Sequence, residues 1–460
     1  MPPRRPPPCH NRSRGKPQPS TPARRGTTIS RRIDDSTTVA RHGRQKSSHP
    51  IRAVATVLLA SLAVVLVSGV SIAAYAAWDV TSSITTVTLA SDDEAAVAQA
   101  AGAAPPPEIS AIDGGVNLLL VGSDSRAGQG DAYGDDEGGA LNDVTMLLHI
   151  GQDHSSATVV SFPRDLVVDI PDCPDGGGYT APINESLSQG GLACTVLTVE
   201  SLSGLSIPFA AEIQFNGVIE MSNAVGGVPV CVTDPIDDEY TGIHMATGTH
   251  VLSGADALGF LRTRHGVGDG SDIGRISSQQ VFLSSLVRTI KSDSTLTDFG
   301  KLYGLAKAAA SNMTLSQRLA SPDTMVSIAL SLKGMDLSKV TFVAYPSYSA
   351  SWVPAGKVAP DTESADILFA AIQADQPVAV AAPGGIASVV DPNAPVTSSP
   401  SATATPAPAD PSAPADPTAT DAAAPVEVAP GEVNAAGATV LPSTVKGQTA
   451  ADYTCSVGND

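Results

Sequence analysis

The stretch VNLLLVGSDSR, residues 116–126, joins an uninterrupted apolar run to a short charged segment. Two similar stretches follow it, DVTMLLHIG at 143–151 and ATVVSFPRD at 157–165. Short apolar runs rich in β-branched residues and bounded by turn residues are typical of buried strands in an α/β sheet. These three stretches therefore predict the first strands of a central sheet.

Apolar residues at helical spacing follow these strands. The pattern predicts a late strand at 341–346 and helices at 195–205, 217–225, 254–263, 273–292, 296–311 and 322–333. Strands that alternate with helices indicate an α/β layered fold. We place this domain at residues 115–384, which is long enough to bury a sizeable core.

The composition of the chain changes outside this domain. Residues 1–52 hold 13 of the 27 lysines and arginines and almost no apolar residues, so we expect a disordered basic arm. Residues 79–114 are predicted to be an Ala-rich extracytoplasmic stalk. Residues 385–460 are predicted to be a Pro/Ala/Thr-rich tail that ends in a short Cys-containing tip, QTAADYTCSVGND.

Residues 53–78 carry no charge and are long enough for a transmembrane helix. Lysines and arginines precede this run and acidic residues follow it, which predicts a cytoplasmic N-terminus and an extracytoplasmic domain. A cleavable signal peptide ending near Ala74-Tyr75-Ala76 is the alternative, but the preceding arm is far too long for one. A basic arm can also bind nucleic acid. Because the arm adjoins an apolar span, we expect a membrane and no nucleic-acid partner.

Four of the five cysteines lie after this span, where disulfides persist. Cys173 and Cys194 bracket a Gly-rich loop and are the favoured pair. Four cysteines allow three connectivities, so the sequence does not decide whether Cys231 pairs with Cys455.

Positive charge is rare in the predicted domain. From Asp79 to Val287 there are 28 acidic residues and five cationic ones, all of them arginine: Arg126, Arg164, Arg262, Arg264 and Arg275. Arginine binds phosphate or carboxylate with a planar two-toothed fork and stays charged. Five separate structural ion pairs are one interpretation. The other is a single site for a strongly anionic group.

Two aspartates stand at the ends of neighbouring predicted strands. Asp124 follows the strand at 116–122, and Asp143 opens the strand at 143–151. If these strands are antiparallel, both carboxylates reach one point and, with phosphate oxygens and water, suit Mg²⁺ or Mn²⁺. The alternative is that both aspartates cap turns or pair with Arg126.

The motifs resemble those of the LytR–CpsA–Psr (LCP) wall-polymer transferases over about residues 115–290. They are GSDSR (122–126), NDVTMLL (142–148), SFPRD (161–165), INESLSQGG (183–191), GGVPVCV (226–232), LSGADALGFLRTR (252–264) and DIGRISSQQ (272–280). The resemblance implies an α/β/α sandwich with a central mixed sheet and a hydrophobic tunnel for a polyprenyl chain, preceded by one transmembrane helix. In this chain, Asn142, Pro182 and Ser278 depart from residues that are frequent in the family.

The resemblance also implies the roles of individual residues. Asp124 and Asp143 would bind the metal, and Arg164, Arg262, Arg264 and Arg275 would act catalytically on the pyrophosphate. The implied substrate-binding residues are Arg126, Asp165, Asn184, Asp272 and Gln279, with Asp272 orienting the arginines. Asp143 or Asp165 is the candidate base, unless the metal lowers the pKa of the attacking hydroxyl.

The expected function is that of a membrane-anchored, metal-dependent phosphotransferase. It would move a glycopolymer from a polyprenyl-pyrophosphate carrier to peptidoglycan and form a phosphodiester link. The alternatives are a non-catalytic regulator that binds the polyprenyl lipid or the polymer, and a pyrophosphohydrolase of the same lipid.

Overall fold

The structure is a computed structural model, and it describes residues 50–90, 92, 114–125, 140–173, 176–291, 299–394 and 429–459. Arg126, the basic arm and most of the segments predicted to be stalk and linker lie outside these residues. The described chain divides into two units at Leu66 and Val67, and the second unit contains the folded domain.

An eight-stranded mixed sheet lies at the centre of the domain. Its strands, in spatial order, are β1 (Thr85–Val87), β12 (Met313–Ser316), β7 (Phe209–Ile213), β2 (Val116–Ser123), β3 (Asn142–Ile150), β4 (Ala157–Phe162), β13 (Val340–Ala344) and β19 (Gly447–Thr449). Strand β2 is antiparallel to β3 and parallel to β7. The three strands predicted from 116–165 are therefore adjacent, in the order β2-β3-β4.

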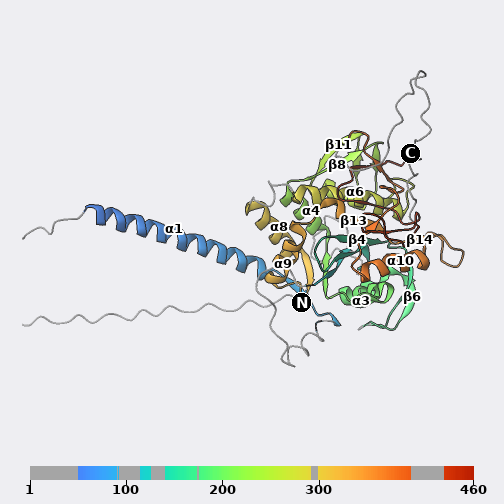
Figure 1. Cartoon of the computed structure of the whole chain (residues 1–460), viewed down its shortest axis with the longest axis horizontal. Helices are drawn as coiled ribbons and strands as arrows, with labels where there is room; N and C mark the ends of the chain where they lie inside the picture. The colour runs from blue at the N-terminus through green and yellow to red at the C-terminus, as the bar shows by residue number, and fades with distance from the viewer. Residues whose placement is uncertain are drawn as a thin grey trace, which may run out of the picture. The chain divides into compact units, whose positions relative to one another are not determined.

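Side chains alternate between the two faces of this sheet, as they must in a strand. Leu119 and Val121 pack in the core cluster that contains α3 (Ser186–Ser203) and α10 (Thr362–Gln373). Leu118 packs in the cluster that contains α9 (Pro322–Lys333). In Figure 1, α3 and α10 lie on one side of β4 and β13, and α6 lies on the other. The predicted α/β/α sandwich with a mixed sheet is confirmed.

A second sheet of four strands carries the end of the chain. Its strands, in order, are β11 (Gly248–Leu252), β8 (Val228–Val232), β20 (Thr454–Ser456) and β17 (Ser388–Val390). It shares a core with α5 (Gly254–Arg262) and α6 (Asp272–Lys291).

The remaining helices of the described domain are α4 (Phe215–Val225), α8 (Phe299–Asn312) and the 3-10 helices η2 (Ile183–Glu185) and η3 (Leu337–Lys339). The remaining strands pair two by two: β5 (Val167–Ile170) with β6 (Tyr179–Pro182), β9 (Ile236–Asp238) with β10 (Ile243–Met245), β14 (Ser347–Tyr348) with β15 (Ala359–Pro360), and β16 (Val378–Ala379) with β18 (Thr439–Val440).

The folded part of the chain extends further in both directions than the sequence predicted. Residues 85–87, assigned to the stalk, form the edge strand β1, because Thr85 and its neighbours pair in parallel with β12. Residues 447–449 lie partly outside the predicted tip, yet they form β19 and pair with β13. The predicted helix at 195–205 begins earlier, at Ser186, with a kink at Gly190 and Gly191 where both backbones leave helical geometry.

Helix α1 (Pro50–Thr81) contains the predicted span. By length and composition it is the one described helix suited to cross a membrane, with a mean hydropathy of 2.4 over Val54–Ile72. Just after the span, Asp79 accepts a hydrogen bond from the hydroxyl of Tyr303 at 2.8 Å and pairs with Lys307 at 2.5 Å, which ties the end of α1 to α8.

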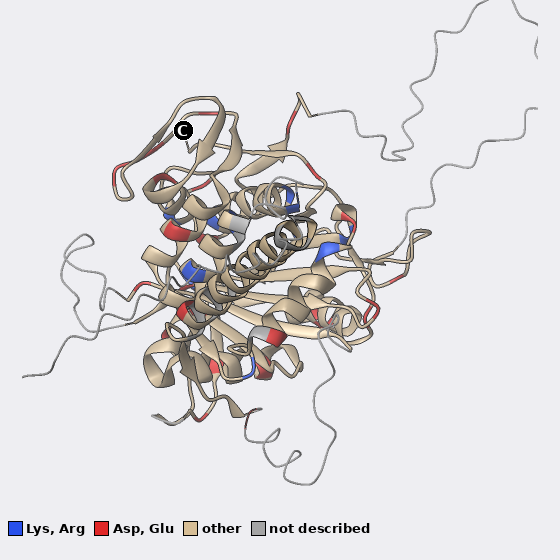
Figure 2. Cartoon of the chain, turned by 90° about the vertical axis from the view of Figure 1, so that its left-hand side faces the viewer, with Lys and Arg blue, Asp and Glu red and all other residues tan. Residues whose placement is uncertain are grey.

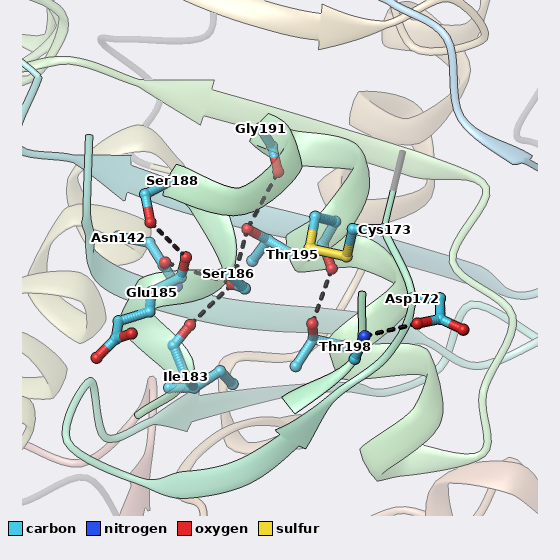
Figure 3. Close-up of a disulfide and its surroundings, with 12 residues drawn as sticks. Asn142, Asp172, Cys173, Ile183, Glu185, Ser186, Ser188, Gly191, Thr195 and Thr198 are labelled. Carbon is cyan, nitrogen blue, oxygen red and sulfur yellow. Dashed lines mark hydrogen bonds between the residues drawn. A yellow bond between two sulfur atoms is a disulfide. The ribbon is translucent and has the colours of Figure 1, made fainter. Parts of the chain in front are cut away.

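Two disulfides join segments of the described domain. Cys173 is bonded to Cys194 in α3, and Cys231 in β8 is bonded to Cys455 in β20. Figure 3 shows the Cys173–Cys194 bond beside the hydroxyls of Ser186 and Thr195, which lie 3.0 Å apart. The second bond links residues 224 positions apart in sequence and fixes the end of the chain to the domain.

One half-buried carboxyl makes the stability of this sheet depend on pH. Burial raises the pKa of Glu212 in β7 above its usual 4.5, and a hydrogen bond from Ser123 opposes the shift only in part. The folded chain therefore holds the proton more tightly than the unfolded chain, and its stability falls as pH rises from 4.5 through the raised pKa. Replacing Glu212 with Gln removes this cost, so we expect Glu212→Gln to raise the Tm at neutral pH.

Thermal unfolding at several pH values measures this effect. The gain in Tm should shrink as pH falls towards 4.5, where the native carboxyl also becomes neutral. Glu220→Gln, on the exposed side of α4, is the matched control and should leave the Tm unchanged. A gain in Tm that is the same at all pH values would contradict the assignment to Glu212.

Candidate active site

The two predicted metal ligands lie at one end of the β2–β3 pair. Ser123 pairs with Asn142 and Gly122 with Val144, so Asp143 is the extra residue of a β-bulge. Asp124 follows β2, and its Oδ1 accepts the backbone N–H of Leu141 at 2.7 Å. The antiparallel arrangement on which the predicted site depends is therefore present.

A buried polar network fixes the start of β3 next to Asp143. Asn142 is fully buried, and its amide donates a hydrogen bond to Thr145 Oγ1 at 2.7 Å. In Figure 3 its side chain points towards Ser186 of α3. Asn142 is one of the departures from the family pattern, and here its amide is held by neighbouring polar side chains.

Arg164 and Asp165 lie in the turn that follows β4. The Nη1 atom of Arg164 is 2.5 Å from Oδ1 of Asp143, and its Nε is 3.8 Å from Oδ2 of Asp165. Burial opposes the charge of Arg164, but Asp143, Asp165 and Asp272 outweigh it and raise the pKa of Arg164 above its usual value. Arg164 therefore stays charged at the centre of a group of aspartates.

The first turn of α6 meets this turn. Asp272 accepts the backbone N–H of Arg164 at 2.8 Å and pairs with Arg275 at 2.6 Å. Arg275, which is only 5% exposed, also donates to the backbone carbonyl of Asp143 at 2.7 Å. Asp272 thus holds both arginines in place, one through its backbone and the other through its guanidinium.

The other two arginines come from the end of α5. The guanidinium of Arg262 lies over the ring of Phe215 at 4.3 Å. Arg264 Nη1 is 3.6 Å from Asp165 Oδ2. The backbone of Arg264 is fixed by Asp238, whose Oδ2 accepts its N–H at 3.2 Å and the hydroxyl of Thr263 at 2.6 Å.

These contacts exclude separate ion pairs for three of the described arginines, Arg164, Arg264 and Arg275. Asp165 contacts both Arg164 and Arg264, and Arg164 and Arg275 both contact Asp143 and Asp272. These three arginines therefore share their partners. Lysines and arginines are few on the described domain (Figure 2), so this shared group is a local concentration of positive charge in an acidic protein. We call Asp143, Arg164, Asp165, Asp272 and Arg275, together with Arg262 and Arg264, the arginine cluster.

An apolar cavity of about 280 Å³ opens beside the arginine cluster. Asp143, Arg262, Arg275 and Gln279 are among the polar residues of its wall. Most of the remaining wall is apolar and comes from β2, β3, β7, β12, α4, α5, α6 and α8, including Leu120, Met146, Phe215, Leu283, Leu305 and Met313. A cavity with a charged group at one side and an apolar interior suits a ligand that has an anionic head and a hydrocarbon chain.

Two further predicted residues lie at the border of the cluster. Gln279 lines the cavity, and its amide donates to the carbonyl of Leu261 at 2.9 Å. Asn184 is buried in η2 and donates its N–H to the carbonyl of Arg164 at 3.2 Å. Its Oδ1 is buried without a hydrogen-bond partner among the described residues. Arg126, the remaining predicted residue, lies outside the described residues.

Sequence reasoning missed two residues of this site. Asp238 positions Arg264, but it stands in the acidic run DPIDDEY with nothing local to distinguish it. Lys357 lies beyond the motif region, and its Nζ is 2.5 Å from Asp165 Oδ1. Only the contact of the turn after β4 with the segment before β15 brings Lys357 to the site.

Ser278, another of the departures from the family pattern, contacts the last strand of the chain. Ser278 is fully buried in α6, and its hydroxyl is 2.7 Å from that of Ser456 in β20. The residues after Ser456 continue along the loop of Arg264: the N–H of Gly268 donates to Val457, and the N–H of Asn459 donates to Gly266, both at 3.0 Å. We call residues 454–459 the C-terminal strap.

The donor atoms at the end of β2 and β3 fit a hard divalent cation. Asp124 and Asp143 offer carboxylate oxygens, the ligand type that Mg²⁺ and Mn²⁺ prefer. Oδ1 of Asp143 contacts Arg164, while its Oδ2 makes no hydrogen bond or ion pair with any residue that the structure describes. That oxygen is available for a metal ion.

The chain matches the LytR_cpsA_psr family over residues 79–368. It is 32% identical over 268 residues to the cell wall biosynthesis protein LcpA of Corynebacterium glutamicum, a match that covers 52% of this chain and 51% of that protein. The polyisoprenyl-teichoic acid–peptidoglycan teichoic acid transferase TagU of Bacillus cereus is 32% identical over 203 residues, 44% of this chain and 62% of TagU. The match thus spans about half the length of the corynebacterial relative. Among solved structures, the LytR-Csp2A-Psr enzyme from Actinomyces oris is similar, with a TM-score of 0.46 and 22% identity over 63% of this chain and 95% of that one.

Proposed function

Because this chain belongs to the LytR_cpsA_psr family, we propose that it is a membrane-anchored phosphotransferase. It moves a glycopolymer from a polyprenyl-pyrophosphate carrier to peptidoglycan and forms a phosphodiester link. The observation that carries this proposal is the arginine cluster at the wall of an apolar cavity. A relative named as a polyisoprenyl-teichoic acid–peptidoglycan transferase supports the same reaction class.

The donor lipid would bind with its two chemically different parts in two environments. The polyprenyl chain enters the apolar cavity, where burial of its hydrocarbon surface supplies the driving force. The pyrophosphate lies against Arg262 and Arg275, which line the same cavity. Fork-shaped guanidiniums bind the phosphate oxygens in fixed directions, which positions the reacting phosphorus.

The reaction is a substitution at the sugar-proximal phosphorus. A hydroxyl oxygen of peptidoglycan forms a bond to this phosphorus, the bond from phosphorus to the bridging oxygen breaks, and polyprenyl phosphate leaves. The proton of the hydroxyl passes to an aspartate, and Asp165 is the candidate because Arg264 and Lys357 fix it in place. Arg164, Arg262, Arg264 and Arg275 stabilise the negative charge that the phosphate oxygens carry in the transition state.

Asp124 and Asp143 would hold a divalent cation, Mg²⁺ or Mn²⁺. When bound, the cation neutralises phosphate charge and lowers the pKa of a hydroxyl that it contacts. The bulge at Asp143 places its carboxylate next to Arg164, and Oδ1 contacts the Arg164 guanidinium. Asp143 would therefore serve both the metal and the arginines.

The proposed location is the outer side of a cell membrane. Helix α1 supplies a single anchor, lysines and arginines precede it, and we infer that the N-terminus lies in the cytoplasm. Both disulfides lie after the span and suit an oxidising compartment.

A single assay tests the proposed function. The full-length chain in detergent, with Mg²⁺, is incubated with a polyprenyl-pyrophosphate-linked glycan and peptidoglycan. We expect polyprenyl phosphate and a glycan–peptidoglycan adduct to form together, and both to disappear when a chelator removes the metal. Polyprenyl phosphate without an adduct would indicate a pyrophosphohydrolase, and retention of intact lipid would indicate a binding protein. Either result would overturn the proposal.

A further inference from the structure

A second pocket, also of about 280 Å³, borders the arginine cluster. Its wall includes Asp165, Arg264 and Asp272 on one side and Ser349, Val353 and Lys357 on the other. The latter three come from the loop between β14 and β15, which we call the acceptor loop (residues 349–358). This pocket shares no lining residue with the apolar cavity.

The two pockets lie on either side of the same ion pairs. Asp272 lines the second pocket and Arg275 lines the apolar cavity, and these two side chains are paired at 2.6 Å. Arg164 contacts Asp143 of the apolar cavity and Asp165 of the second pocket. A phosphate held by the cluster is therefore reached from both pockets.

In phosphoryl transfer, the attacking and leaving oxygens lie roughly in line across the phosphorus. If the leaving polyprenyl phosphate occupies the apolar cavity, the attacking hydroxyl must come from the other side. We propose that the second pocket and the acceptor loop bind the acceptor glycan of peptidoglycan. This inference rests on the proposed function and adds to it the place and residues of the second substrate.

The chemistry of the pocket suits a neutral sugar. Asp165 and Asp272 are balanced by Arg264 and Lys357, so the wall offers hydrogen-bond donors and acceptors without excess charge. The loop also carries Trp352, which is 62% exposed, in a chain with two tryptophans. A large aromatic face exposed to water suits a contact with the apolar C–H face of a sugar ring.

The acceptor loop is held in place before any ligand binds. Strands β14 and β15 pair with each other, and the N–H of Val358 donates to the carbonyl of Asp165 at 3.1 Å. Val353 packs in a small core with Val167 of β5. A turn from Ala350 to Val353, closed by a 3.4 Å backbone hydrogen bond, presents Trp352 to solvent. A pre-ordered loop avoids much of the entropy loss of binding.

Tryptophan fluorescence tests the binding directly. In the full-length Trp78→Phe variant, Trp352 is the one remaining tryptophan. We expect tetra-N-acetylchitotetraose, a soluble probe for the glycan backbone, to change its emission saturably, and maltotetraose to leave it unchanged. No change with the chito-oligosaccharide would overturn the inference. This measurement needs no donor lipid, so its outcome is separate from that of the transfer assay.

Kinetics in the transfer assay provide the second test. Trp352→Ala should raise the KM for the peptidoglycan acceptor about tenfold, with kcat and the KM for the donor lipid near wild-type values. Trp352→Phe should restore most of the acceptor affinity, because it keeps an aromatic face. Lys357→Met should also raise the acceptor KM, whereas the exposed Lys333→Met in α9 should not. An unchanged acceptor KM in Trp352→Ala would refute the assignment of the pocket.

Discussion

The double variant Arg262→Ala, Arg264→Ala is expected to lose transfer activity by at least about a thousandfold. Both guanidiniums lie at the wall of a pocket beside the proposed pyrophosphate site, one in each pocket. Their charge matters most in the transition state, so kcat should fall more than donor affinity. Replacing Arg264 with Lys should recover only part of the rate, because lysine keeps the charge but lacks the planar fork.

The fold should survive these substitutions. Arg262 and Arg264 are half-buried, and neither forms part of the hydrophobic core. Arg318→Ala is the matched control, since Arg318 also lies over a phenylalanine ring, that of Phe209 at 5.3 Å, but outside the cluster. Circular dichroism and Tm check folding, and initial rates of adduct formation check activity. Retained transfer in the folded double variant would show that the cluster does not act on the pyrophosphate.

Opening the second disulfide, in a Cys231→Ser, Cys455→Ser variant, is expected to lower both stability and activity. The bond closes 224 residues, so its loss should cost about 2–5 kcal/mol of unfolding free energy. It also holds the C-terminal strap, which contacts the loop of Arg264 through Gly268 and Asn459. A shift of Arg264 by about 1 Å is sufficient to lower the rate about a hundredfold.

Two measurements separate the activity loss from general unfolding. Below the Tm of the variant, the amide of Gly268 should exchange its hydrogen faster than in the unchanged chain, because its acceptor Val457 lies in the strap. A Cys173→Ser, Cys194→Ser variant is the control: it opens a bond that closes 21 residues and does not involve the strap. It should lose stability but keep protection at Gly268. Equal exchange at Gly268 in both variants would argue against coupling through the strap.

Local sequence pattern predicted four of the eight strands of the central sheet, β2, β3, β4 and β13. The runs at 116–122, 143–151 and 157–165 correspond to β2, β3 and β4, because strands that are buried over most of their length are rich in apolar residues. Helix α6 matched its prediction within one residue at each end. The other four strands of that sheet, β1, β7, β12 and β19, were missed, as were the four strands of the second sheet. They have three to five residues each, and pairing with distant strands stabilises them.

The arginines of the site were also visible in the sequence, because the domain is acidic and lacks lysine over a long stretch. The residues that contact these arginines could be predicted from the sequence only in part. Asp272 lies three residues before Arg275, and Asp165 directly follows Arg164. Asp238 and Lys357 had no local signal, and two tryptophans in the whole chain gave no reason to expect a sugar-binding surface.

The amino-acid sequence by itself determined the α/β class, the apolar span and the set of arginines, since periodicity, charge and residue type are local properties. Only the tertiary structure decided that Arg164, Arg264 and Arg275 share aspartates, that Lys357 meets Asp165 and that the C-terminal strap contacts the loop that contains Arg264. Such contacts join residues far apart in the chain, and they form only when strand register and sheet order bring the segments together.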